Sequence, residues 1–204
     1  MKWSTHVLLG ALLAISLSAS AREAAAVTNI DSCRTITQSG SYRLTKNLHA
    51  KGDCLIVDAD FVTIDLNGHT ITGNGTGNGV GDDFFQQGRR GIVVRNGTIA
   101  NFQSGVSLAF SEGCIVEQLR VFDNKFDGIS AGTGSIVRGN IAIGNVNGFR
   151  LSSGTTMTGN TARDNTDGIE ITCPSNVIGN TATGNTRNLL EFGSFCNLRD
   201  NVAQ

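Results

Sequence analysis

Apolar residues recur along the chain in columns about twenty residues apart. One column is a glycine or asparagine followed by an apolar residue, with spacings of 26, 23, 20, 20 and 20 residues. Its apolar members are Val80, Val106, Ile129, Phe149, Ile169 and Leu189. A second column comprises Ile115, Ile136, Met157, Val177 and Leu198, and a third Val121, Ala142, Ala162, Ala182 and Ala203. Three columns that share one period indicate an internal structural repeat.

Each repeat consists of short segments with the pattern of β-strands. In the segment VTIDL, apolar and polar residues alternate, so Val62, Ile64 and Leu66 share one face. No segment after residue 26 shows a sustained helical period. Three short strands per repeat predict a coil that pairs in parallel with the next coil, about 4.8 Å away. We therefore predict an all-β parallel β-helix, a solenoid of about six coils of 20–23 residues.

Asparagines follow the same period in two further columns. They are Asn140, Asn160, Asn180 and Asn201 in one, and Asn124, Asn145, Asn165 and Asn185 in the other. Asparagine tolerates the left-handed backbone of sharp corners, and its amide can bond to the amide one coil away. A polar ligand strip is the alternative, but columns that keep the period of the fold favour internal asparagine ladders.

The start of the chain has the pattern of a secretory signal peptide. Lys2 precedes an apolar run at 7–17, and small residues follow at 19–21. Cleavage after residue 26 stays an alternative. A membrane anchor is disfavoured because about 11 apolar residues are too few to span a bilayer. We predict a secreted protein, extracellular or periplasmic, with a signal peptide at 1–21, an N-terminal cap and entry strands at 22–61, and the β-helix at 62–204.

Residues 54–73 (CLIVDADFVTIDLNGHTITG), residues 91–102 (GIVVRNGTIANF) and the asparagine-rich coils that follow carry a family resemblance. They resemble right-handed parallel β-helix proteins of the pectin-lyase-like group. The chain is most similar to small secreted members without assigned activity, over about residues 33–204. The resemblance implies a right-handed coil, which is also the usual hand of parallel crossovers.

The five cysteines suit an oxidising compartment. None has the close spacing of a zinc or redox motif, so structural bridges are favoured. The resemblance and their proximity suggest that Cys33 and Cys54 staple the N-terminal cap. Cys173 and Cys196 are 23 residues apart, about one coil, and could bridge neighbouring corners. Cys114 remains as a free, partly buried thiol.

The charge balance restricts the partners. Lys plus Arg total 16 and Asp plus Glu total 17, so a strongly basic nucleic-acid surface is excluded. No later segment is apolar enough to span a membrane. We expect no cofactor and no metal site. Asp127 and Asp167 share a column, but Asn147 separates them, and two coils are on the order of 10 Å, too far for one Ca²⁺.

The segment Asn165-Thr166-Asp167-Gly168 supplies a weak catalytic candidate. It resembles the Asn-Thr-Asp motif of polygalacturonases, in which the aspartate is a catalytic carboxylate. The other motifs of that family do not follow here, and the repeat itself would place an aspartate in this column. Glycoside hydrolysis needs a second carboxyl group nearby. The sequence shows no converging set, so the catalytic residues are unknown, with Asp167 the candidate.

An insertion between Gly73 and Arg90 interrupts the repeat, and insertions on repeat scaffolds often carry function. Its ligand-binding candidates are Asp82, Asp83, Phe84, Phe85, Arg89 and Arg90. The aromatic rings could contact sugar faces, and the guanidinium groups could pair with carboxylates. The favoured alternative is a connecting glycine loop with no ligand.

These observations favour a non-catalytic module that contacts polysaccharide or a cell-surface glycan. The alternative is a polysaccharide lyase, hydrolase or epimerase, which needs carboxylates, or carboxylates plus an arginine, converging on one groove. A structural or ice-binding protein is a minor alternative, because the threonine rows are short and interrupted. Uncapped parallel strands in the last coil can pair with another chain, so we also hypothesise a weak end-to-end dimer.

Overall fold

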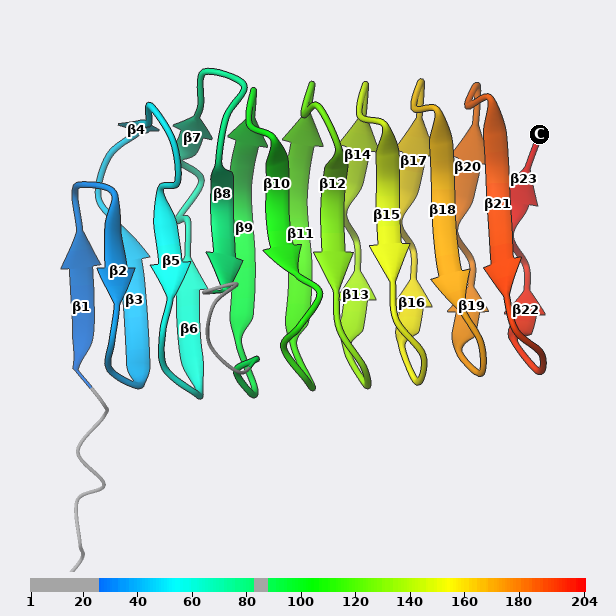
Figure 1. Ribbon diagram of the computed structural model, residues 1–204, viewed down its shortest axis with the longest axis horizontal. Coiled ribbons are helices and arrows are strands. Elements are labelled where there is room, and N and C mark those ends of the chain that lie inside the picture. The colour runs from blue at the N-terminus through cyan, green and yellow to red at the C-terminus, as the bar shows by residue number, and fades with distance from the viewer. Residues whose placement is uncertain (1–25, 83–87) are drawn as a thin grey trace, which may run out of the picture.

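The computed structural model describes residues 26–82 and 88–204 of the chain. Within these ranges the regular structure is entirely β, and the strands stack in two parallel sheets along a solenoid (Figure 1). The two sheets lie on opposite sides of the coil, and their strands run in opposite directions (Figure 1). The predicted all-β parallel β-helix is confirmed.

One sheet contains eight strands and receives one strand from every coil. These strands are β2 (Arg34–Ile36), β5 (Leu55–Val57), β8 (Asn78–Asp82), β10 (Ser104–Leu108), β12 (Asp127–Ala131), β15 (Asn147–Leu151), β18 (Asp167–Thr172) and β21 (Arg187–Phe192). The solenoid therefore has eight coils rather than about six. The additional coils lie within residues 27–57, where β2 already pairs in register with β5.

The other sheet contains fifteen strands, because most coils contribute two strands separated by a corner. In the first coils these are β1 (Val27–Ile30), β3 (Gly40–Leu44), β4 (Leu48–His49), β6 (Val62–Asp65) and β7 (Thr70–Thr72). The middle coils supply β9 (Val93–Ala100), β11 (Ile115–Phe122), β13 (Ile136–Arg138) and β14 (Ile141–Ile143). The last coils supply β16 (Thr156–Thr158), β17 (Thr161–Arg163), β19 (Asn176–Ile178), β20 (Thr181–Thr183), β22 (Asn197–Arg199) and β23 (Val202–Ala203).

Two of the predicted columns form the core as expected. Val106 pairs with Val80 and with Ile129 in the eight-stranded sheet, and the column continues through Phe149 and Ile169. In the fifteen-stranded sheet, the column from Val121 through the alanines is in register in the same way. Because like residues stack on like, few apolar side chains per coil suffice to fill the interior.

In the second column, the first two predicted members, Ile115 and Ile136, are each one residue away from the inward position. Val116, not Ile115, is in line with Val137 and Met157, and both valines are fully buried. Ile136 pairs with Thr156 on the outer face and is 37% exposed. Each isoleucine is followed by a valine, so two adjacent β-branched apolar residues compete for one inward position. Hydrophobicity alone does not decide between them.

The asparagine columns form buried ladders. The Asn160 backbone N–H and Nδ2 both donate to Asn180 Oδ1, at 2.9 and 3.0 Å, and Nδ2 also donates to the Val137 carbonyl at 2.9 Å. The ladder through Asn145 and Asn165 repeats this arrangement. The ladder side chains are internal and bonded to one another, which confirms the structural interpretation over the ligand strip.

The left-handed residues at the corners directly precede the ladder asparagines. In one column they are Gly139, Gly159 and Gly179, with φ of 63°, 62° and 65°. In the other they are Asp123, Gly144, Asp164 and Gly184, with φ of 53°, 70°, 56° and 69°. The prediction that the ladder asparagines themselves adopt this conformation is therefore wrong. Glycine or aspartate makes the turn, and the asparagine fixes the turn to the next coil.

Both predicted disulfides form, and Cys114 is free as predicted but fully rather than partly buried. Cys33 bonds to Cys54 and Cys173 bonds to Cys196, and in both cases the disulfide joins adjacent coils. Within the part of the chain that the structure describes, no helix is long and apolar enough to cross a membrane. Phe192, Leu198 and Val202 are exposed on the last coil, and the end-to-end dimer stays a prediction.

Candidate functional site

A groove of about 640 Å³ lies on the outer face of the eight-stranded sheet. It extends over five consecutive coils, from β8 to β18. Its lining residues are Asn78, Gln103, Ser104, Ser107, Ala109, Phe110, Phe126, Asp127, Ser130, Asn147, Arg150, Leu151, Ser152, Glu170 and Thr172. Most of these side chains are polar or charged, so the groove presents a hydrogen-bonding floor.

Two phenylalanines stand at opposite edges of this floor. Phe126 directly precedes β12, and Phe110 follows the end of β10, so the two rings lie at opposite ends of neighbouring strands. They are 53% and 55% exposed. Large exposed aromatic side chains beside a polar groove are typical of binding sites.

Three charged side chains from three coils meet on the floor. The Arg150 guanidinium lies 4.0 Å from Asp127 Oδ2 through Nη1 and 3.5 Å from Glu170 Oε1 through Nε. Ser130, Arg150 and Glu170 are in register on β12, β15 and β18, which explains why the arginine and the glutamate are adjacent. Asp127 is on β12, one coil before Arg150. The charged lining of the groove is thus two carboxylates around one guanidinium.

The column that contains the sequence candidate Asp167 also contributes Asp127 and Asn147 to the groove lining. Asp127, Asn147, Asp167 and Arg187 pair in register from coil to coil. Asn147 Nδ2 donates to Asp127 Oδ1 at 2.7 Å. Arg187 donates to both carboxylate oxygens of Asp167, each at 2.5 Å, and Asp167 raises the pKa of the Arg187 guanidinium. The Asp167 carboxylate is buried under a bidentate partner, which is a structural arrangement rather than an accessible catalytic one.

Of the insertion candidates, those within the described residues, Asp82, Arg89 and Arg90, do not form one surface cluster. Asp83, Phe84 and Phe85 lie outside the described residues. Arg89 is ion-paired with Asp58, and its Nε is buried without a hydrogen-bond partner among the described residues. Arg90 is exposed and lies 3.6 Å from Glu112. Both arginines thus have carboxylate partners within the protein, so neither is presented as an isolated cation for an acidic ligand.

Asp82 faces the interior instead of a ligand. It pairs with Val57 of β5, an inward position, and is 6% exposed. Ser111 Oγ donates to Asp82 Oδ2 at 2.8 Å. Burial raises the pKa of the Asp82 carboxyl, and the Ser111 hydrogen bond partly opposes this. As a ligand-binding candidate Asp82 would have to be accessible, but at the end of β8 its side chain points inward with its strand.

Potential metal ligands converge at one place in the described ranges, at Cys173, Glu191 and Cys196. The two cysteines form a disulfide, so their sulfurs are not available as thiolate ligands. No carboxylate cluster of the kind that Ca²⁺ prefers is found among the described residues.

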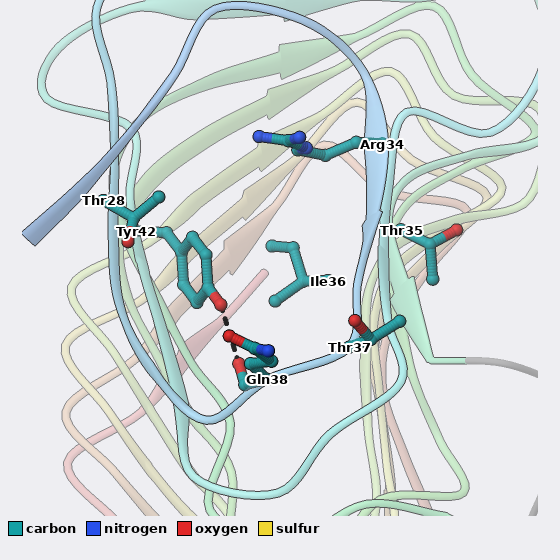
Figure 2. A pocket seen from close by; sticks show the side chains of 7 residues that line it. All are labelled: Thr28, Arg34, Thr35, Ile36, Thr37, Gln38 and Tyr42. Carbon is teal, nitrogen blue, oxygen red and sulfur yellow. Dashed lines mark hydrogen bonds between the residues drawn. The ribbon is translucent and has the colours of Figure 1, made fainter.

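A second hollow, of about 220 Å³, opens at the first coil. Figure 2 shows it to be lined by Thr28, Arg34, Thr35, Ile36, Thr37, Gln38 and Tyr42. The Tyr42 hydroxyl donates to the Gln38 carbonyl at 2.8 Å, and Ile36 is part of the core. This hollow is smaller than the groove and has no carboxylate in its lining. The groove is therefore the better candidate site.

The most informative groove residues were not among the sequence candidates. Phe110, Phe126, Arg150 and Glu170 belong to no periodic column, because outward positions are free to vary from coil to coil. The available signal was the register itself: once Phe149 and Ile169 are placed inward, Arg150 and Glu170 must be adjacent and outward. Two carboxylates and an arginine thus converge on one groove, contrary to the prediction from the sequence.

One of three comparisons with known proteins found a match, and that match agrees with this architecture. Searches of curated proteins and of solved structures found no match. A family model described as "Right handed beta helix region" matches residues 35–202, which is most of the chain. The match covers all the coils that build the groove. The chain therefore belongs to the right-handed β-helix family.

Proposed function

We propose that this protein is a secreted, non-catalytic β-helix module that binds a polysaccharide or cell-surface glycan in the groove of the eight-stranded sheet. The observation that carries the proposal is the combination of exposed phenylalanines with a polar floor across five coils. Five coils span about 19 Å from first to last strand, which accommodates several sugar units of an extended chain.

The groove offers the two kinds of contact that a sugar needs. The apolar C–H face of a pyranose can pack against the Phe126 ring, which is half exposed at the edge of the floor. Hydroxyl groups can bond to side chains such as Ser107 and Gln103, which offer both donors and acceptors. A few polar groups beside aromatic surface are usual in small-molecule and sugar sites.

Binding without cleavage is supported by the position of Arg150. In glycoside hydrolysis, two carboxyl groups flank the scissile bond, one as acid and one as base or nucleophile. Here Asp127 and Glu170 flank a guanidinium that lies within 4.0 Å of both. In this arrangement the guanidinium, and not a scissile bond, lies next to both carboxylates.

The same three residues favour a second candidate, a polysaccharide lyase, hydrolase or epimerase. If a bound sugar displaced Arg150, Asp127 and Glu170 would face one ligand from two coils. Catalysis would then appear as new reducing ends or as unsaturated product. Incubation with uronate and neutral polymers, with and without Ca²⁺, tests this; any turnover that Glu170→Gln abolishes would replace the binding proposal.

Secretion is supported by the two disulfides, since such bonds persist mainly outside the reducing cytosol. Fractionation of cells that express the full chain tests this part of the proposal. The protein is expected in the medium or the periplasm with its N-terminal segment removed. Retention of the intact chain in the cytosol would contradict it.

The direct test of glycan binding is an array of immobilised plant, fungal and bacterial polysaccharides, followed by calorimetry. Phe126→Ala should weaken binding at least tenfold, because aromatic anchors dominate binding energy. Phe61→Ala is the matched control: Phe61 is 68% exposed and does not line the groove, so its loss should change nothing. Absence of binding to every polysaccharide, or equal effects of the two variants, would contradict the proposal.

A further inference from the structure

The charges on the groove floor determine which class of glycan it accepts. We infer that the groove selects uncharged polysaccharide and rejects polyuronates, because Asp127 and Glu170 outnumber and surround Arg150. This inference rests on the proposed function, since it concerns the ligand of that same groove.

The side chains that line the groove carry more negative than positive charge. Its ionisable residues are Asp127, Arg150 and Glu170, which give a net charge of −1. The adjacent Asp167 and Arg187 neutralise each other in a bidentate pair. An acidic chain laid along the floor would therefore meet two carboxylates for one guanidinium.

Arg150 is already paired on both sides. Its Nη1 lies 4.0 Å from Asp127 Oδ2, and its Nε lies 3.5 Å from Glu170 Oε1. A uronate carboxylate that approached the guanidinium would have to displace one of these partners or lie beside both. Like charges placed together across an interface are costly, and specificity often comes from such repulsion.

The carboxylates instead suit hydroxyl donors. The Asp127 and Glu170 side chains are 13% and 25% exposed, so both are partly removed from water but still reachable. Asp127 accepts a hydrogen bond from Asn147, and a carboxylate has about four acceptor sites. Neutral sugars carry several hydroxyls per unit, and hydrogen bonds to a charged acceptor are the stronger kind.

The test compares neutral and acidic ligands of equal length. The probes are hexasaccharides of β-glucan, mannan, xylan and galactan against those of galacturonate and guluronate, measured by calorimetry at low and moderate salt. At least one neutral probe should bind about tenfold or more tightly than both uronates. The discrimination should shrink as salt rises, because screening weakens the repulsion.

The variant Asp127→Asn/Glu170→Gln removes both carboxylates and leaves Arg150 in place. It should bind the uronate probes about tenfold more tightly than the wild type and the neutral probes less tightly. The control Asp65→Asn/Glu117→Gln makes the same charge change on the fifteen-stranded sheet, where these residues pair with Arg95 and Arg138. This control should leave both preferences unchanged.

The outcomes separate the inference from the function on which it rests. Equal or tighter binding of uronate by the wild type, or a double variant that gains no uronate affinity, overturns the charge selection while glycan binding stands. If no probe and no array polysaccharide binds, the proposed function fails and the inference falls with it.

Discussion

Asp82 places a carboxyl group where neighbouring coils place apolar side chains. Its partner in β5 is the fully buried Val57, and its hydrogen-bond partner is Ser111. Burial raises the pKa of this carboxyl, so the folded state holds the proton more tightly than the unfolded chain does. Ionisation therefore costs stability as the pH rises from the ordinary aspartate value through the raised one.

We predict that Asp82→Asn raises the melting temperature by a few degrees at pH 7. The amide has no charge to desolvate, and its oxygen can still accept from Ser111. At pH 3, where the carboxyl is protonated in both states, the difference should vanish. Thermal melts of the two proteins from pH 3 to 8 provide the measurement. A variant that is less stable than the wild type at pH 7 would show that ionised Asp82 stabilises the fold.

Cys114 is a second buried group whose pKa is raised by its surroundings. Burial raises the pKa of its thiol to about 11, and the nearby Asp82 charge adds to this. Since the thiolate is the reactive form, alkylation at pH 8 should be at least about 100-fold slower than for a thiol of pKa 9. Timed labelling followed by mass spectrometry measures this rate. Rapid labelling of the native protein would contradict the buried position; denaturant should restore rapid labelling.

At the level of the strand and its corner, the asparagine ladder provides stability that a larger hydrophobic core would otherwise provide. Each ladder amide joins the turns of two coils while it satisfies buried backbone groups. The short strands of the later coils contain only about three residues in the fifteen-stranded sheet. Such strands hold their register because the corners on both sides are fixed.

We therefore predict that Asn160→Ala destabilises the protein by about 2–5 kcal/mol. It leaves the Asn140 backbone N–H without its acceptor, and Asn140 Nδ2 keeps only its bond to the Val116 carbonyl; each buried unsatisfied donor hydrogen costs about 1–3 kcal/mol. Urea denaturation measures the change.

The control for the ladder is Asn176→Ala. Asn176 is exposed on β19, where its side chain accepts a hydrogen bond from Asn197 Nδ2, so a change below about 0.5 kcal/mol is expected. Equal effects at positions 160 and 176 would contradict the internal ladder.

The elements also show where sequence reasoning succeeds and where it stops. The alanine column and the asparagine ladders were predictable, because each coil repeats the same residue in the same environment. The inward side at Ile115-Val116 was not, because two adjacent apolar residues fit one position. Likewise Asp82 was predicted to belong to a loop, because a charged residue is rarely expected at an inward strand position.

Across the solenoid as a whole, the inward-facing residues repeat from coil to coil, whereas the residues that face solvent differ between coils. The repeat period determines which residues face the interior, so most of these residues could be predicted from the sequence. The groove combines residues from five coils, and the contact of Arg150 with Glu170 on its floor depends on lateral register between strands 20 residues apart. For this reason Arg150 and Glu170 can be recognised as neighbours only once the register between coils is known.

Under the proposed function, glycan occupies the outer face of the eight-stranded sheet. Carbodiimide labelling of carboxyl groups, with and without a bound neutral oligosaccharide, tests it residue by residue through mass spectrometry. We predict protection of Asp127 and Glu170. Labelling of Asp164 and Glu112, whose side chains are 59% and 63% exposed outside the groove, should not change. Undiminished labelling of Asp127 and Glu170 at saturating ligand would show that glycan does not bind in this groove.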